Sequence, residues 1–152
     1  MSLQSVREFF AENAPDITII ELEQSTATVA QAAAAHQVEP GQIAKTLSLK
    51  IKDRAILVVA SGDARLDNKK LKETFGAKAR MLSTDEVIVL TGHPVGGVCP
   101  FGLENPLTVY CDVSLQQYEE VLPAAGATHS AVRISPQRMA SLTAATWVDV
   151  CQ

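Results

Sequence analysis

Cysteine and histidine are too few and too scattered in this sequence of 152 residues to predict a disulfide framework or a metal site. The cysteines are Cys99, Cys111 and Cys151, and the histidines are His36, His93 and His129. An odd number of cysteines without CxxC spacing argues against disulfides and against zinc, and no HExxH pair is present. We therefore expect reduced thiols, no metal ion and no cofactor.

Long apolar runs, internal repeats and low-complexity tracts are also missing. No run approaches the ~18 apolar residues of a membrane span, and residues 1–7 lack the basic and then apolar design of a signal peptide. With 47% hydrophobic and 20% charged residues, the composition is that of one globular domain. We expect a single cytoplasmic domain over residues 1–152 that has no membrane partner.

Positive charge is not in excess. There are 13 lysine and arginine residues against 17 acidic residues, which gives a net charge of −4 and a pI of about 5.3. The global charge signature of a nucleic-acid-binding protein is therefore absent, and no DNA partner is expected. A local basic patch stays open, because several cations fall close together: Lys45, Arg65, Lys69, Lys70, Lys72, Lys78 and Arg80. This cluster is either a solvated helix face or a binding surface.

The sequence does contain an alternation of helical and strand patterns. Helices are predicted over residues 3–13, 28–36, 67–76, 83–92 and 136–142, and strands over 17–22, 42–51, 55–60, 107–111, 131–134 and 147–150. Ser25 or Thr26 is expected to cap the alanine-rich second helix. The unbroken apolar run at 55–60 predicts a central strand covered on both faces. Short turns join several strands, so antiparallel pairing should be common and the fold class is mixed α/β.

Two helix starts are well specified. Asp67 can cap one helix, and Ser83 with Glu86 forms a capping box for the next. Gly76 and Gly92 stand where these helices should end, which predicts left-handed C-caps. These signals define the fold and carry no chemistry of their own.

Lys45 stands out because it falls on the apolar face of a predicted strand. That face of residues 42–51 carries Ile43, Leu47, Leu49, Ile51 and also Lys45. A buried ammonium loses hydration worth several kcal/mol unless an anion or a wet cavity meets it. We expect a cleft lined by this strand, with a carboxylate, phosphate or ligand oxygen at Lys45. The alternatives are that Lys45 snorkels to water or pairs with a structural acid.

The segment from Gly92 to Gly102 combines four glycines with two prolines in eleven residues. Glycines permit positive φ and close approach of main-chain N–H groups to a ligand, while prolines fix the neighbouring angles. The segment fits neither the GxxxxGK[ST] phosphate loop nor GxGxxG after a strand. It is either a cradle for an anion or oxyanion, or a turn.

Cys99 lies in this loop, which leaves open a thiol nucleophile served by His93 or His129. Main-chain amides lower a thiol pKa and supply an oxyanion hole in sites of that kind. The simpler interpretation is that Cys99 is a small apolar side chain.

Taken jointly, the motifs resemble those of the YbaK/EbsC family, the aminoacyl-tRNA deacylases related to the editing domain of bacterial prolyl-tRNA synthetases. The matching segments are the helix at 29–34, Gln42-Ile43-Ala44-Lys45-Thr46-Leu47, the strand end Val58-Val59-Ala60-Ser61-Gly62-Asp63, and the loop at 92–102. The resemblance covers nearly the whole chain. It implies a central mixed, largely antiparallel and strongly curved sheet surrounded by helices.

The resemblance also implies a trans-editing hydrolase that cleaves the ester of a mischarged aminoacyl-tRNA, with tRNA-Pro carrying a small wrong amino acid as the expected substrate. Lys45 matches the essential lysine of the family and is the expected catalytic residue. The expected substrate-binding residues are Thr46, Ser61, Gly62, Asp63, His93, Gly96, Gly97, Val98, Pro100, Phe101, Gly102 and His129. An activated ester needs positioning, an oriented water and oxyanion stabilisation, so no covalent nucleophile is required.

Thr46 stands where some alanine-specific relatives carry asparagine, so an alanine preference does not transfer directly. Asp63 and Asp112 either orient Lys45 or the ribose, or serve as turn and cap residues.

The expected partners are the 3′ acceptor end of aminoacyl-tRNA and, as a candidate, prolyl-tRNA synthetase. The alternative function is a non-catalytic module that binds tRNA ends or the synthetase.

Overall fold

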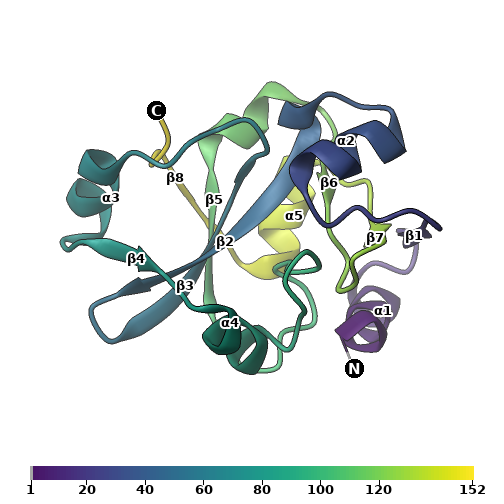
Figure 1. Cartoon of the computed structure of the whole chain (residues 1–152), viewed down its shortest axis with the longest axis horizontal. Coiled ribbons are helices and arrows are strands. Elements are labelled where there is room, and N and C mark those ends of the chain that lie inside the picture. The colour runs from purple at the N-terminus through teal and green to yellow at the C-terminus, as the bar shows by residue number, and fades with distance from the viewer. Residues whose placement is uncertain (1) are drawn as a thin grey trace.

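The computed structural model describes residues 2–152 (Figure 1). The helices are α1 (Ser2–Asn13), α2 (Val29–His36), α3 (Asn68–Phe75), α4 (Thr84–Thr91) and α5 (Pro136–Thr143), with 3-10 turns η1 (Pro40–Gln42) and η2 (Val113–Gln117). The strands are β1 (Ile20–Glu21), β2 (Ile43–Ile51), β3 (Arg54–Ser61), β4 (Ala79–Met81), β5 (Thr108–Asp112), β6 (Leu122–Pro123), β7 (Ser130–Ala131) and β8 (Thr146–Val148). No helix within residues 2–152 is long and apolar enough to span a bilayer.

The main sheet has the strand order β4-β2-β3-β5-β8, and β6 pairs with the start of β2. β2 pairs antiparallel with β3 and β4, whereas the pairs β2–β6, β3–β5 and β5–β8 are parallel. The sheet is therefore mixed, as predicted, with antiparallel pairing at β2 and parallel pairing from β3 to β8. The links from β3 to β5 and from β5 to β8 contain helices, which let the chain return in the same direction. The strong curvature stays a prediction.

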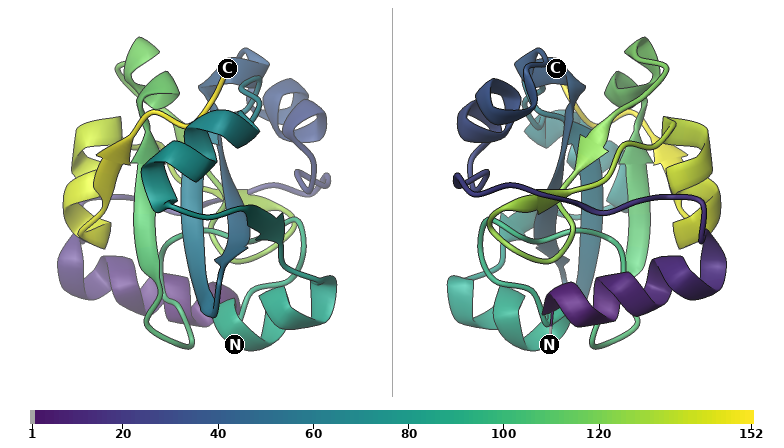
Figure 2. Two further views of the ribbon diagram at one scale, coloured as in Figure 1. Left: turned by 90° about the vertical axis from the view of Figure 1, so that its left-hand side faces the viewer. Right: turned by 90° about the vertical axis from the view of Figure 1, so that its right-hand side faces the viewer.

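β3 is the central strand, as its apolar run predicts. Its side chains alternate between two buried clusters, so both faces of the strand are covered. Leu57 and Val59 pack with residues of α1 and α5, which lie on the same side of the sheet (Figure 2). Ile56 and Val58 pack on the opposite face with Leu71 of α3.

The capping predictions for α3 and α4 are confirmed. The Asp67 carboxylate accepts from the N–H groups of the first turn of α3, and Ser83 and Glu86 form the reciprocal capping box of α4. Gly76 and Gly92 end these helices, each with φ of +76°.

The cap of α2 differs from the prediction. It is Thr28, whose hydroxyl accepts from the Gln31 N–H while the Gln31 side chain returns to the Thr28 N–H. Thr28 is preferred because only it stands three residues before a glutamine that completes the box.

Two predicted strands are shorter than their sequence patterns. The strand predicted at 17–22 is reduced to β1 and the one at 131–134 to β7, and the two pair in a separate two-stranded sheet. The short strands β4 and β6 were not predicted, because two or three residues carry no readable periodicity.

Candidate active site

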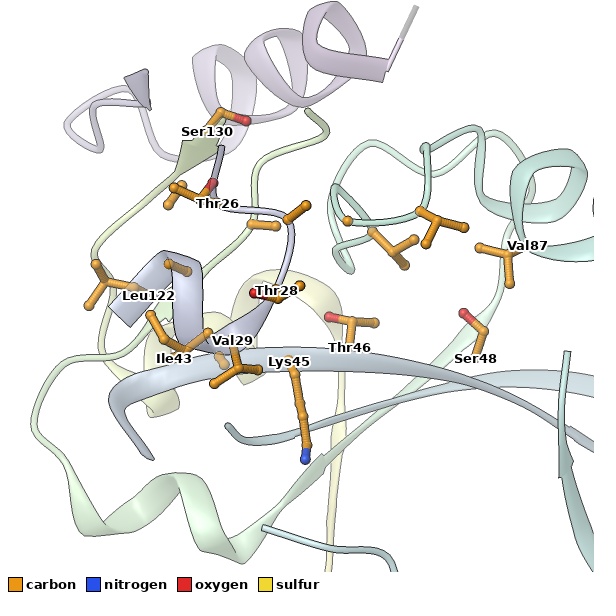
Figure 3. A pocket seen from close by; sticks show the side chains of 18 of the residues that line it. Thr26, Thr28, Val29, Ile43, Lys45, Thr46, Ser48, Val87, Leu122 and Ser130 are labelled. Carbon is orange, nitrogen blue, oxygen red and sulfur yellow. The ribbon is translucent and has the colours of Figure 1, made fainter. Parts of the chain in front are cut away.

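A pocket of about 310 Å³ lies between the N-terminal part of β2, helix α2, helix α4 and the loop that follows α4 (Figure 3). Its walls are mostly apolar. They include Val29, Ala32, Ile43, Val87, Val95, Val98, Leu122 and Ala131. Hydroxyl groups come from Thr26, Thr28, Thr46, Ser48, Thr84 and Ser130. An apolar cavity of this size with a few polar groups is typical of a small-molecule or substrate-end site.

The side chains of β2 diverge at the pocket (Figure 3). Thr46 and Ser48 point into the cavity; Lys45 also lines it, but its ammonium points away, toward the opposite face of the sheet. The strand register agrees. Leu47 lies opposite Val58, whose side chain packs under α3, and Lys45, two residues before Leu47, lies opposite Ala60 on the same face of the sheet. The predicted apolar face of Lys45 is thus confirmed.

Ile43 departs from the predicted alternation. It packs with Ala32, Ala33 and Leu122 on the pocket side instead of sharing the face of Lys45. Ile43 directly follows η1 and pairs with β6, outside the β2–β3 ladder that begins at Ala44. Its side chain therefore does not follow the in-and-out alternation of the rest of β2.

The partners of Lys45 are main-chain carbonyls. Its Nζ donates to the oxygens of Gly62 (3.3 Å) and Ala64, in the turn that follows β3. No ion pair to Lys45 occurs among residues 2–152 within 4.0 Å. Burial lowers the pKa of Lys45, which the nearby Asp63 carboxylate partly offsets. The cleft lined by this strand is found, and the Lys45 ammonium is held by main-chain carbonyl oxygens on the opposite face of the sheet; a ligand oxygen at Lys45 stays a prediction.

Thr46 Oγ1 and His36 Nε2 in the pocket wall are buried and have no hydrogen-bond partner among residues 2–152. By contrast, Thr28 Oγ1 is used in the cap of α2, and Thr26 Oγ1 donates to Thr128 O at 3.3 Å. An unpaired buried hydroxyl costs about 1–3 kcal/mol, so it marks a place where a ligand or water completes the structure. Burial and the charge of Arg133 lower the pKa of His36, which favours its neutral form.

Gly96 and Gly97 hold the loop after α4 against two other loops. A Cβ on Gly96, where φ is +92°, would lie 2.7 Å from Ala27 Cβ, and one on Gly97 would lie 2.8 Å from Ala127 N. The Gly97 N–H donates to Pro94 O at 2.9 Å and is not available to a ligand. Close approach of backbones is therefore the structural reason for both glycines, and Gly96 and Val98 line the pocket.

The structure places the rest of this loop in the core, outside the pocket lining. His93 is fully buried; its Nε2–H donates to Phe101 O (2.8 Å), and its Nδ1 pairs with Ser2 Oγ. Phe101 packs against Phe9 and Phe10. Gly102, with φ of +58°, lies against the backbone of α1. Pro100 is also buried and does not line the pocket.

Cys99 is not placed to act as a nucleophile. It is fully buried outside the pocket lining, and its Sγ lies 3.6 Å from both Phe101 O and His93 Nε2. Burial raises the pKa of Cys99 to about 12, so the reactive thiolate is scarcely populated near neutral pH. The thiol hypothesis is wrong on this geometry.

Ser61, Gly62 and Asp63 gather at the turn that receives Lys45, outside the pocket lining. Ser61 Oγ lies within hydrogen-bond distance of Gly41 O (2.6 Å) and Asp63 Oδ1 (2.8 Å), which share its one proton, and the close packing of Gly62 on Pro40 O leaves no room for a Cβ. Asp112 accepts from Ser114 N and Val150 N, so it is a buried cap of η2.

His129 lies apart from these groups. Its imidazole is partly exposed, 3.8 Å from Glu21 Oε1, and does not line the pocket. Within residues 2–152, no three His, Cys, Asp or Glu side chains gather closely enough to hold a metal ion.

Residues 23–142 match the family model of the aminoacyl-tRNA editing domain. The chain belongs to this family. A relative in Bacillus subtilis (strain 168), the uncharacterized protein YwhH, is 47% identical over the whole of this chain and 98% of its own length. A solved protein provisionally described as a trans-editing enzyme for prolyl-tRNA synthetase is 34% identical, with a TM-score of 0.92 over 99% of this chain and 97% of its own.

This editing domain also matches part of much longer proteins. It is 28% identical over 107 residues to the proline–tRNA ligase of Bacillus pumilus, and the match covers 69% of this chain but only 19% of the ligase. The likeness therefore concerns one segment of the ligase and not its whole activity.

Sequence reasoning missed most of the pocket wall of the editing domain. Ser48 could have been found, because the alternation that places Lys45 on one face of β2 places Thr46 and Ser48 on the other. His36, Val87 and Leu122 carry no such signal, since tertiary contacts alone bring α2, α4 and β6 around the start of β2.

Proposed function

We propose that this editing domain hydrolyses the ester bond of a mischarged aminoacyl-tRNA, with tRNA-Pro carrying a small wrong amino acid as substrate. The observation that carries the proposal is the position of the pocket. Every residue that lines it, from Thr26 to Ala131, falls inside the 23–142 segment that matches the editing domain. The structural likeness to a protein provisionally described as a trans-editing enzyme for prolyl-tRNA synthetase supports the choice of tRNA.

The chemistry suits the groups present. An aminoacyl ester is already activated, so the site must orient the ester and a water molecule and stabilise the developing oxyanion. The unpartnered Thr46 hydroxyl binds the substrate or the water, and the main chain at Gly96 and Val98 contacts the aminoacyl group. As the family resemblance implies, a ribose hydroxyl of the substrate helps to activate the water. No covalent intermediate with the protein forms.

Selection between amino acids comes from the apolar wall. Val29, Ile43 and Leu122 limit the size of the side chain that fits beside β2. One methylene is worth about 1–3 kcal/mol in such a site, which suffices for a sieve that admits a small wrong amino acid and rejects a larger correct one.

Lys45 has a positioning role in this proposal. Its ammonium fixes β2 to the turn at Gly62–Ala64 from the face opposite the pocket, and Thr46 is its immediate neighbour. A direct contact of Lys45 with the terminal nucleotide, as the resemblance implies, requires the side chain to leave these two carbonyls.

The test is hydrolysis of tRNA charged in turn with alanine, serine, cysteine, threonine and proline, by the wild type and by Thr46→Val, Lys45→Ala and Cys99→Ala. The proposal predicts clearance of a small mischarged amino acid, loss of clearance in the first two variants and full activity in the third. Binding of tRNA or of prolyl-tRNA synthetase without hydrolysis of any ester would replace it with the non-catalytic binding module.

A further inference from the structure

The start of helix α1 contacts two loops that line the pocket. These are the loop after α4 and the segment from β6 to β7, which supply the wall residues Val95, Gly96, Val98, Ala124, Ser130 and Ala131. The two loops are joined to each other, because the Gly126 N–H donates to Gly97 O at 3.1 Å. The residues of α1 (2–13) stand outside the pocket lining, so any effect of α1 on the pocket passes through these loops.

The Ser2 side chain connects α1 to both loops. Its Oγ lies within hydrogen-bond distance of His93 Nδ1, at the start of the loop after α4, and of Gly126 O, in the segment from β6 to β7. The two backbones are in close contact here, since a Cβ on Gly126 would lie 2.8 Å from Ser2 O. Ser2 thus meets residues that are 91 and 124 positions away in the sequence.

The protons of this network follow from its acceptors. Phe101 O can only accept, so His93 Nε2 carries the proton of the 2.8 Å bond between them. Burial lowers the pKa of His93, which favours the neutral ring, and in a neutral ring the other nitrogen, Nδ1, is an acceptor. The donor beside Nδ1 is the Ser2 hydroxyl, whose one proton is shared between Nδ1 and Gly126 O.

We propose that the Ser2 hydroxyl positions the two loops against each other and thereby sets the shape of the pocket, which deepens the proposed function and rests on it. A buried acceptor that loses its donor is unfavourable, so without this hydroxyl His93 Nδ1 and Gly126 O shift toward other donors or water. Such a shift moves the wall that contacts the aminoacyl group. Thr46 lies on β2, outside this network, and keeps its place.

The first test is amide hydrogen exchange measured by NMR, which follows the loops without any activity. Ser2→Ala is compared with Ser5→Ala, a matched control whose hydroxyl donates inside α1, to Ser2 O at 2.8 Å. We expect the Gly126 N–H to exchange about tenfold faster in Ser2→Ala, because loss of one buried hydrogen bond eases local opening. Ser5→Ala should keep the wild-type rate, and Ser2→Thr should restore it. A wild-type rate in Ser2→Ala would overturn the proposal.

The ¹⁵N signals of the His93 ring report the network itself. In Ser2→Ala the signal of the unprotonated Nδ1 should move, because its donor is lost, whereas Nε2 keeps its bond to Phe101 O. Ser5→Ala should leave both signals in place. If Nδ1 gives the same signal in Ser2→Ala as in the wild type, Ser2 does not donate to His93 and the proposal falls.

Hydrolysis separates this inference from the proposed function. Ser2→Ala should raise KM for mischarged tRNA by about three- to tenfold and leave kcat within about twofold, because the loops bind the aminoacyl group and Thr46 is unchanged. A wild-type KM in Ser2→Ala, or an equal rise in Ser5→Ala, would overturn the positioning role. If the wild type hydrolyses no mischarged tRNA, the proposed function fails, while exchange at Gly126 still decides whether Ser2 holds the loops.

Discussion

Lys45 and Thr46 are adjacent in β2, yet their side chains serve opposite faces of the sheet. The Lys45 ammonium donates to the carbonyls of Gly62 and Ala64, whereas Thr46 Oγ1 ends in the pocket without a partner. Lys45 thus forms hydrogen bonds within the protein, whereas the Thr46 hydroxyl is left to bond a ligand. This division supplies the sharpest predictions about the site.

Thr46→Val should separate stability from activity. Replacing an unpartnered buried hydroxyl with a methyl group removes a desolvation cost, so we expect the free energy of unfolding to rise by up to about 1 kcal/mol. Deacylation should fall about tenfold or more, because the substrate loses its hydrogen bond. Chemical denaturation and single-turnover hydrolysis measure the two effects, with Thr46→Ser as the control that keeps the hydroxyl. A variant that is both less stable and fully active would contradict this role.

Gly96→Ala should reduce stability and activity more than an alanine at another glycine of positive φ, because the added Cβ at Gly96 also meets a neighbouring residue. The matched control is Gly76→Ala, because Gly76 also has positive φ (+76°) but no atom within 4 Å of an added Cβ. We expect Gly76→Ala to cost about 1 kcal/mol and to leave deacylation unchanged. Gly96→Ala adds a clash with Ala27, so it should cost more stability and reduce deacylation. Equal stability and activity in the two variants would show that the contact with Ala27 is unimportant.

Cys99→Ala should leave the rate of ester hydrolysis within about twofold of the wild type. The thiol is fully buried away from the pocket, and burial raises the pKa of Cys99 to about 12. Loss of a small buried side chain should still cost about 1 kcal/mol of stability. Steady-state kinetics at a temperature where both proteins are folded makes the comparison. An inactive but folded Cys99→Ala protein would restore the thiol mechanism.

The buried imidazole of His93 should make the fold sensitive to acid. Burial lowers the pKa of His93 from 6.5, so below about pH 6.5 His93 is protonated in the unfolded chain while it stays neutral in the folded chain. The free energy of unfolding therefore has its full value above that pH. It falls as the pH drops, by up to about 1.4 kcal/mol per pH unit for one group. His36, whose pKa is also lowered, adds to the same trend.

Denaturation between pH 7 and pH 5 tests this linkage. The slope of stability against pH should be smaller in His93→Gln than in the wild type. His129→Gln is the control, because its imidazole is partly exposed and near Glu21. The slope matters and not the absolute stability, since the variant also loses the hydrogen bond to Phe101. An unchanged slope in His93→Gln would rule out His93 as the source.

Elements with strong local signals were predictable from the sequence. The central strand β3, the caps of α3 and α4 and the inward face of Lys45 all follow from patterns within ten residues. The direction of the Lys45 ammonium was not predictable, because the carbonyls that receive it belong to a turn seventeen residues or more away. The pocket wall at Val87 and Leu122, and the parallel pairing of β5, depend likewise on tertiary packing.

Hydrolysis of mischarged tRNA-Pro by the wild-type protein tests the central claim most directly. With tRNA-Pro charged with alanine, serine, cysteine, threonine or proline, we expect rapid release of at least one small wrong amino acid, little release of proline, and loss of the activity in Thr46→Val. If all five esters survive at the rate seen without protein, although the protein is folded and binds tRNA, the chain is not an editing hydrolase for this tRNA and the account is wrong.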